Sequence, residues 1–127
     1  MNDKAFEELR ENVEQWAEDK DLLHEENTEK QFMKFIEEVF EFKAEMDIWK
    51  LYKTFKHAEN IEQDLSMQEF ERWKNMQLEM GDIFVTLIVL CNQLGIDCVE
   101  CLQLAYEKIS KRRGKTIDGT FVKEEDL

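Results

Sequence analysis

The stretch FIEEVFEFKAEMDIW, residues 35–49, sets acidic side chains among large apolar ones, and a second stretch, LEMGDIFVTLIVLCNQLG, residues 78–95, does the same. In the first stretch the apolar residues recur at three- and four-residue spacing, which is typical of a helix with one buried face. The second contains IFVTLIVLC, residues 83–91, which is apolar on every side of a helix and is therefore expected to be buried on nearly every side. The two stretches therefore predict helices whose carboxylates stand where the core meets water.

The composition predicts one folded, all-α domain over residues 1–127. Of the 127 residues, 43% are hydrophobic and 37% are charged, and there are four glycines and no proline. This length is sufficient for a core without disulfides, and the lack of proline disfavours a fold with many turns. We expect a bundle of four to five helices with a short C-terminal hairpin or extended tail.

Charge and cysteine content argue against several functions. With 30 acids and 17 bases the formal net charge is −13, so the chain would repel a phosphate backbone and nucleic-acid binding is not expected. The run 83–91 is shorter than the roughly 20 residues that cross a bilayer, and the N-terminus lacks a signal-peptide pattern, so we expect a cytoplasmic protein without a membrane partner.

Cys98 and Cys101 form a C-x-x-C pair, but no further Cys or His lies at a spacing suited to a zinc site. Zinc and redox chemistry are therefore not expected.

Periodicity and end signals predict four helical segments. They are Asp3 to about Lys20, Thr28 to the middle fifties, Ser66 to Leu94, and Cys98 to about Arg113. Thr28 with Gln31 fits a capping box at the start of the second segment, and Ser66 with Glu69 fits another at the start of the third. The polar stretch HAENIEQDL, residues 57–65, is expected to separate these two helices.

Glycine and aspartate mark the later boundaries. Gly95 is expected to stop the third helix in a left-handed conformation, and Asp97 to cap the fourth. Gly114 is expected to end the fourth helix. Asp118-Gly119 is a pair favoured in two-residue hairpin turns, which predicts the hairpin in the tail.

Each of the two opening stretches carries a pair of acids three residues apart. Glu38 and Glu41 project from adjacent turns, and Glu45, on the side of Glu38, is a possible fifth acid. Glu79 and Asp82 directly precede the apolar run, so they are expected to be partly desolvated. Acids brought together in this way would repel one another and raise their own pKa values unless a cation held them. All-oxygen ligation favours Mg²⁺ or Mn²⁺.

The spacing alone is weak evidence, because a chain this rich in acids contains roughly seven acid-x-x-acid pairs by chance. Two interpretations stay open. A metal site predicts that both pairs converge, whereas a non-catalytic acidic helical interaction module predicts acids spread over exposed faces. A ferritin-like di-metal site is disfavoured because neither pair belongs to a Glu-x-x-His motif.

Several segments together resemble one family. KFIEEVFEF followed by LEMGDIFVTLIVLCNQLGID resembles the E-E-x-x-E and E-x-x-D motifs of the all-α, MazG-like nucleoside triphosphate pyrophosphohydrolases. AYEKISKRRGKTIDGTFVKEED looks like the C-terminal segment of small MazG-like proteins of phages and bacteria, and VEQWAEDKDLL extends the similarity toward the N-terminus. The resemblance implies a MazG-like bundle that forms a homodimer or homotetramer, and the wide apolar faces of the second and third helices agree with this.

The resemblance also implies the reaction and its residues. The family pattern places Mg²⁺, or Mn²⁺, on Glu38, Glu41, Glu79 and Asp82. Glu37 and Glu38 are the candidate catalytic carboxylates, with Glu37 orienting water. The implied reaction is hydrolysis of a nucleoside triphosphate between its α and β phosphates, giving the monophosphate and pyrophosphate, and deoxynucleotides are favoured by the resemblance alone. The segment between the two motifs is longer than in compact family members, which bears on the substrate contacts.

The candidate substrate contacts lie elsewhere in the chain. A basic cluster near the predicted end of the fourth helix consists of Lys108, Lys111, Arg112, Arg113 and Lys115. Either these residues hold the β and γ phosphates of a substrate, or they lie there because positive charge near a helix C-terminus interacts favourably with the helix dipole. Lys108 and Arg112 are the best candidates for phosphate contacts because they are expected to share a helix face. Trp16 either stacks on the base, as the resemblance suggests, or completes the apolar stripe of the first helix, which favours a place in the core.

Overall fold

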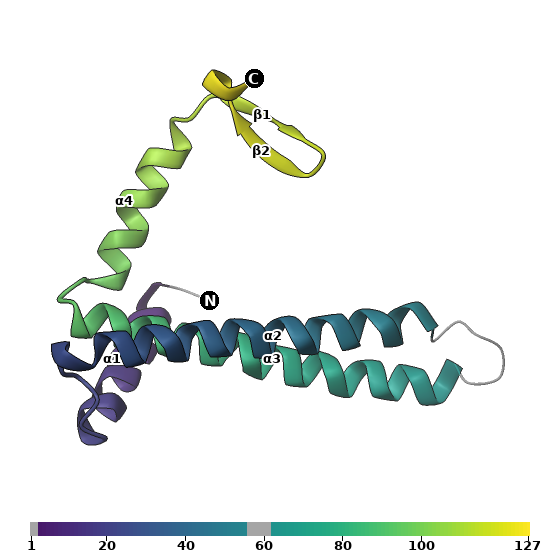
Figure 1. Ribbon diagram of the computed structural model, residues 1–127, viewed down its shortest axis with the longest axis horizontal. Helices are drawn as coiled ribbons and strands as arrows, with labels where there is room; N and C mark the ends of the chain where they lie inside the picture. The colour runs from purple at the N-terminus through teal and green to yellow at the C-terminus, as the bar shows by residue number, and fades with distance from the viewer. Residues whose placement is uncertain (1–2, 56–61) are drawn as a thin grey trace. The chain divides into compact units, whose positions relative to one another are not determined.

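The computed structural model describes the backbone of residues 3–55 and 62–127 and the side chains of residues 5–55 and 67–127. This part of the chain is mostly helical, with four α-helices and a small antiparallel sheet (Figure 1). In chain order the elements are α1 Asp3–Asp19, the 3-10 turn η1 Glu25–Asn27, α2 Thr28–Phe55, α3 Glu62–Gln93, α4 Cys98–Ser110, β1 Gly114–Ile117, β2 Thr120–Lys123 and the 3-10 turn η2 Glu124–Asp126. The predicted helical character and C-terminal hairpin are confirmed. The contacts divide the chain into two units, Met1–Gly95 and Ile96–Leu127, which are described separately, and a single MazG-like bundle stays a prediction.

In the first unit α2 and α3 lie side by side and run in opposite directions (Figure 1). Two polar contacts join the helices at different positions along their length. The Gln31 side-chain amide donates to the backbone oxygen of Thr86 at 3.3 Å, and Arg72 Nη1 lies 3.5 Å from Glu45 Oε2. These contacts, with the apolar packing between them, fix which residues of the two helices face each other.

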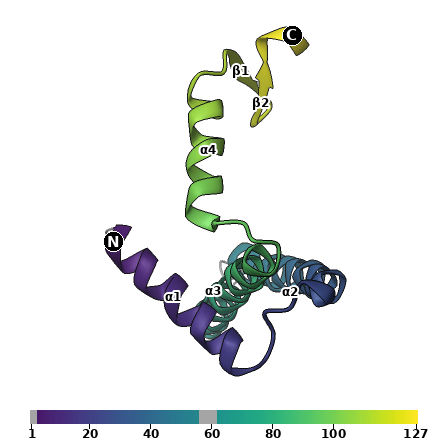
Figure 2. The ribbon, with the colours of Figure 1, turned by 90° about the vertical axis from the view of Figure 1, so that its left-hand side faces the viewer.

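The helix α1 packs against α3 (Figure 2). Ala17 of α1 is completely buried, as the apolar stripe of this helix predicts. Two amides near the end of α3 reach α1 and the turn that follows it. Asn92 Nδ2 donates to Glu14 Oε2 at 3.2 Å, and the buried Gln93 donates through Nε2 to the backbone oxygen of Leu22 at 2.7 Å. These hydrogen bonds hold α1 and the turn that follows it on the α2–α3 pair.

The predicted boundary between the third and fourth helices is confirmed. Gly95 has φ 72°, the left-handed conformation in which a side chain is disfavoured, and α3 ends two residues before it. The Asp97 carboxylate accepts hydrogen bonds from the backbone N–H groups of Val99 at 2.9 Å and Glu100 at 3.0 Å. Asp97 therefore caps α4, since it satisfies two donors that the first turn leaves unpaired.

Both predicted capping boxes are wrong. Thr28 already has helical backbone angles and follows η1, whereas an N-cap residue is non-helical, and Gln31 reaches across to α3 instead of back to Thr28. The third helix begins at Glu62, so Ser66 lies inside it. Of the polar stretch expected to separate the two helices, residues 57–61 lie outside the described part of the chain and residues 62–65 are helical. The sequence of a capping box is also tolerated within a helix.

In the second unit β1 and β2 form an antiparallel hairpin. Asp118 and Gly119 have φ 51° and 80°, so they form the two-residue turn that this pair predicts. The helix α4 ends at Ser110, which corrects the prediction that Gly114 terminates it. Gly114 is the first residue of β1, and a Cβ there would overlap the carbonyl oxygen of Val122. Glycine is thus required at this position by the close approach of the two strands.

A single chain buries few apolar side chains. Among the described residues the buried hydrophobic ones are Ala17, Ile88 and Val89. Phe84 is 53% exposed, so the expectation that the run 83–91 is buried on nearly every side is not met within one chain. No single helix in the described ranges is long and apolar enough to cross a membrane, and only α3 and α4 taken as a pair meet that test.

The glycines of α3 predict opposite responses to the same substitution. At Gly81, inside the helix, a Cβ would have no neighbour within 4 Å, so Gly81→Ala should raise the free energy of unfolding by about 0.5–1 kcal/mol. At Gly95 the positive φ makes a side chain unfavourable, so Gly95→Ala should lower it by about 1 kcal/mol. Urea denaturation followed by circular dichroism, at one protein concentration, measures both. A destabilising Gly81→Ala would show that this position is not open.

Candidate metal centre

The register of α2 against α3 brings carboxylates from both helices together. Residues 31, 38 and 45 of α2 are seven apart, about two helical turns, and residues 86, 79 and 72 of α3 have the same spacing in the opposite direction. Residue 31 contacts residue 86, and residue 45 contacts residue 72. The pair between them, Glu38 and Glu79, must therefore also face each other.

Glu38, Glu41 and Glu79 form what we call the carboxylate triad. One carboxylate oxygen from each lies within 4.8 Å of the other two. Glu38 is buried with 6% of its surface exposed, Glu79 is half-buried and Glu41 is exposed. The triad thus has a buried end and an end that is open to solvent, as a site that admits a ligand requires.

Two oxygens of the triad are buried and have no hydrogen-bond partner. They are Oε2 of Glu38 and Oε2 of Glu79. A buried carboxylate oxygen without a partner is costly, and a cation placed between the two helices would satisfy both. Oxygen ligands at 2.0–2.1 Å suit Mg²⁺, and two ligands on opposite sides of that ion are roughly 4.2 Å apart. Three oxygens around one such ion lie at or below that separation, so small side-chain movements would bring the triad to ligating distance, and the residues fit a hard divalent cation.

The triad acids repel one another, and this repulsion raises the pKa values of two of them. The charge of Glu38, followed by desolvation, raises the pKa of Glu41 above its ordinary value. Burial raises the pKa of Glu79, and the charges of Glu41 and Glu38 add to the effect. Both directions match the sequence prediction that acids brought together without a cation raise their own pKa values.

One lysine, Lys34, faces this group. Its Nζ lies 3.1 Å from Glu38 Oε1 and 3.6 Å from Glu37 Oε2, and the hydrogen bond to Glu38 raises the pKa of Lys34. Lys34 contacts Oε1 of Glu38, whereas the oxygen of Glu38 without a partner is Oε2. The Lys34 side chain is half exposed. It therefore offsets only part of the negative charge. Lys34 is not among the residues predicted from the sequence, although its spacing of three and four residues from Glu37 and Glu38 is a local signal.

The other predicted acids take different positions. Asp82 is exposed and lies outside the triad, yet its charge contributes to raising the pKa of Glu79, so its role as a ligand stays a prediction. Glu37 is exposed and next to Lys34. Glu45 is held by Arg72 instead of joining the triad.

The predicted substrate contacts belong to two units. Trp16 is 47% exposed, so the expectation that it joins the core is wrong within one chain, and base stacking by its ring stays a prediction. Lys108 and Arg112 belong to the second unit, where both line a cavity of about 600 Å³. Holding the β and γ phosphates stays a prediction for both.

A cation in the triad predicts a pH-dependent thermal response. Because the folded-state pKa values of Glu41 and Glu79 are raised, the folded chain binds more protons than the unfolded chain just above pH 4.5, and metal-free stability should fall as pH rises through that range. Mn²⁺ needs these carboxylates deprotonated. It should therefore raise the melting temperature at about pH 7 and far less at about pH 5, as melting curves with MnCl₂ and with EDTA will show.

The matched variants are Glu79→Gln in the triad and Glu11→Gln on α1. Each removes one negative charge, and Glu11 is exposed on a different helix. Glu79→Gln should raise the melting temperature without metal and lose most of the Mn²⁺ response, whereas Glu11→Gln should keep it. Equal responses in the two variants would place the metal elsewhere.

No family model, curated protein or solved structure matches this chain.

Proposed function

We propose that this protein is a Mg²⁺-dependent nucleoside triphosphate pyrophosphohydrolase, which cleaves its substrate between the α and β phosphates to the monophosphate and pyrophosphate. The observation that carries the proposal is the convergence of three carboxylates from two helices, with two buried oxygens unpaired. The MazG-like resemblance of both acid motifs supports the same reaction. An acidic surface that only attracts a partner would not need buried, unpaired carboxylate oxygens, so the interaction module is less well supported.

The triad would hold the cation through Glu38, Glu41 and Glu79, with Asp82 as a further candidate ligand beside Glu79. A bound Mg²⁺ supplies charge neutralisation for the triphosphate and lowers the pKa of a coordinated water. The triad alone would repel so strongly anionic a substrate. Substrate binding at this site is therefore expected to require the cation.

Glu37 is the carboxylate best placed to handle water. It is exposed and adjacent in sequence to Glu38, and it borders a surface hollow of about 550 Å³ on α2. Glu38 is occupied by Lys34 and by the triad. We assign to Glu37 the orientation of the attacking water and the acceptance of its proton, with Lys34 holding the carboxylate in place.

The remaining substrate contacts follow from chemistry. Arg112 can make a bidentate contact to a phosphate group, and Lys108, which lines the same cavity, supplies a second positive charge. Trp16, with its ring half exposed, can stack on a nucleobase.

We further propose that the chain forms a homodimer or homotetramer. Large apolar side chains are exposed on the same two helices that carry the triad. Phe40 of α2 is 68% exposed, and Leu78 of α3 is 69% exposed. Large exposed apolar side chains on one helix pair are typical of a protein–protein interface, and a second copy of the chain would cover them.

Product analysis tests the reaction. Incubation of the protein with each deoxy- and ribonucleoside triphosphate and Mg²⁺ should give monophosphate and pyrophosphate in equal amounts, and EDTA should abolish both because the triad then repels the substrate. Chromatography of the nucleotides and a pyrophosphate assay measure this. Release of orthophosphate, or activity that survives EDTA, would contradict the proposed reaction.

Variants connect that activity to the residues. Glu37→Gln should lower kcat/KM by at least about a hundredfold, the usual effect of removing a general base. Glu11→Gln, with the same charge change on α1, should keep the wild-type rate. A wild-type rate in Glu37→Gln would remove this residue from the mechanism while leaving the triad as the site.

The oligomer predicts a measurable mass. Light scattering coupled to size-exclusion chromatography should give a mass of two or four times the 15.3 kDa of one chain. Leu78→Glu places a charge on the apolar surface and should lower the measured mass. Gln77→Glu adds the same charge at the adjacent, exposed polar position and should leave the mass unchanged. A wild-type mass of one chain at micromolar concentration would contradict the assembly.

A further inference from the structure

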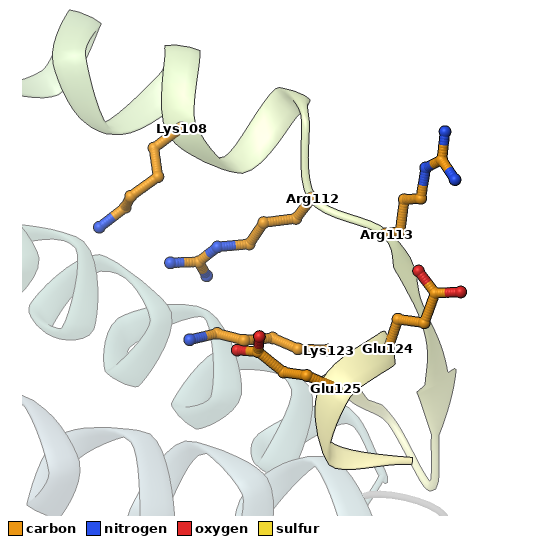
Figure 3. A pocket seen from close by; sticks show the side chains of 6 residues that line it. All are labelled: Lys108, Arg112, Arg113, Lys123, Glu124 and Glu125. Atoms are coloured by element: carbon orange, nitrogen blue, oxygen red, sulfur yellow. The ribbon is translucent and has the colours of Figure 1, made fainter.

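The second unit contains a basic pocket between the end of α4 and the hairpin. The cavity of about 600 Å³ is lined by Lys108, Arg112, Arg113, Lys123, Glu124 and Glu125. Figure 3 shows the charged ends of Lys108, Arg112 and Lys123 extending into the same space, while the side chain of Arg113 points away from it. We call Lys108, Arg112 and Lys123 the cationic trio.

The backbone fixes the place of Lys123 in this trio. Lys123 is the last residue of β2 and pairs with Gly114 of β1. The backbone N–H of Glu124 donates to the carbonyl oxygen of Arg113 at 2.8 Å. Because Arg113 follows Arg112 directly, these contacts hold the end of β2 next to the end of α4. The position of Lys123 therefore depends on the hairpin register as well as on its flexible side chain.

The trio carries positive charge that the described residues do not neutralise by ion pairing. No ion pair within 4 Å joins Lys108, Arg112 or Lys123 to an acid in the part of the chain that the structure describes. Glu124 is turned away from the trio in Figure 3, and the carboxylate of Glu125 extends toward the side of Lys123. Three cations, one each from α4, the segment that follows it and β2, in a chain with a net charge of −13, form a local site that favours an anion.

We propose that this pocket binds pyrophosphate and the equivalent terminal group of a triphosphate, and that Lys123 of the hairpin is a direct ligand beside Lys108 and Arg112. The guanidinium fork suits two oxygens of one phosphoryl group, and two ammonium groups can meet the charge of a second. A cavity of this volume is larger than a single phosphate needs. That the bound anion is the leaving group of the reaction rests on the proposed function, whereas the binding itself does not.

Calorimetric titration of the whole chain with sodium pyrophosphate, in EDTA and at low ionic strength, tests the pocket. Chelation leaves the carboxylate triad able only to repel the anion, so any binding must come from basic residues. We expect one site per chain. Lys123→Gln should weaken binding about ten- to a hundredfold, the usual effect of losing a hydrogen bond to a charged group. Lys123→Arg should keep most of the affinity, and Glu125→Gln should strengthen binding because it removes a nearby negative charge.

The matched control is Lys115→Gln. Lys115 lies on β1 of the same hairpin and does not line the pocket, so this variant loses the same charge without losing a ligand. Its affinity for pyrophosphate should stay within about twofold of the wild type, because exposed charges act weakly at a distance. Equal weakening by Lys123→Gln and Lys115→Gln, or no binding by the wild type, would overturn the proposal.

Hydrolysis assays separate this proposal from the proposed function. Loss of hydrolysis in Glu37→Gln with unchanged pyrophosphate binding would support both. A wild-type chain that binds pyrophosphate through Lys123 but hydrolyses no triphosphate would support the pocket and remove its link to the reaction. Hydrolysis by a wild-type chain that binds no pyrophosphate in EDTA would overturn the pocket alone.

Discussion

The register of α2 against α3 is the constraint on which the carboxylate triad depends. The contacts from Gln31 to Thr86 and from Glu45 to Arg72 lie two helical turns to either side of Glu38 and Glu79. A shift of the two helices by one turn, about 5.4 Å, would break both contacts and separate the carboxylates. The two polar contacts are long, at 3.3 and 3.5 Å, and each is expected to contribute only modestly to stability, so their main effect is to select one register among several that apolar packing would accept.

That register holds acids together against their own repulsion. The raised pKa values of Glu41 and Glu79 show that folding brings these groups into an environment that disfavours their charged forms. Lys34 relieves part of the repulsion but leaves an oxygen of Glu38 and one of Glu79 unpaired. Without a cation the first unit is therefore less stable at neutral pH than its packing alone would make it. Such preorganisation is what a site for a hard divalent ion needs, since the ligands are in place before the ion arrives.

Much of this arrangement was predictable because its signals are local. Helical periodicity gave the extents of α1 and α2 to within about two residues, and Asp97, Gly95 and the Asp118-Gly119 pair act where their backbone preferences place them. The convergence of three acids was also predictable, because acids beside two apolar faces meet when those faces pack. The structure itself was needed for what depends on pairing distant residues: the helix register, the exposed position of Asp82 and the place of Lys123. Trp16 was misplaced because the periodicity shows which residues share a face but not whether another element covers that face.

The distribution of charge along the chain agrees with a polyphosphate ligand. An acidic protein can hold such a ligand either through a cation bound by its acids or through basic residues directly, and this sequence carries both kinds of group. The carboxylate triad lies in the first unit and the cationic trio in the second. Since the trio needs no metal, it would retain affinity for pyrophosphate after the cation has left. In the proposed pocket, free pyrophosphate would therefore compete with the terminal phosphates of a triphosphate for the same three cations.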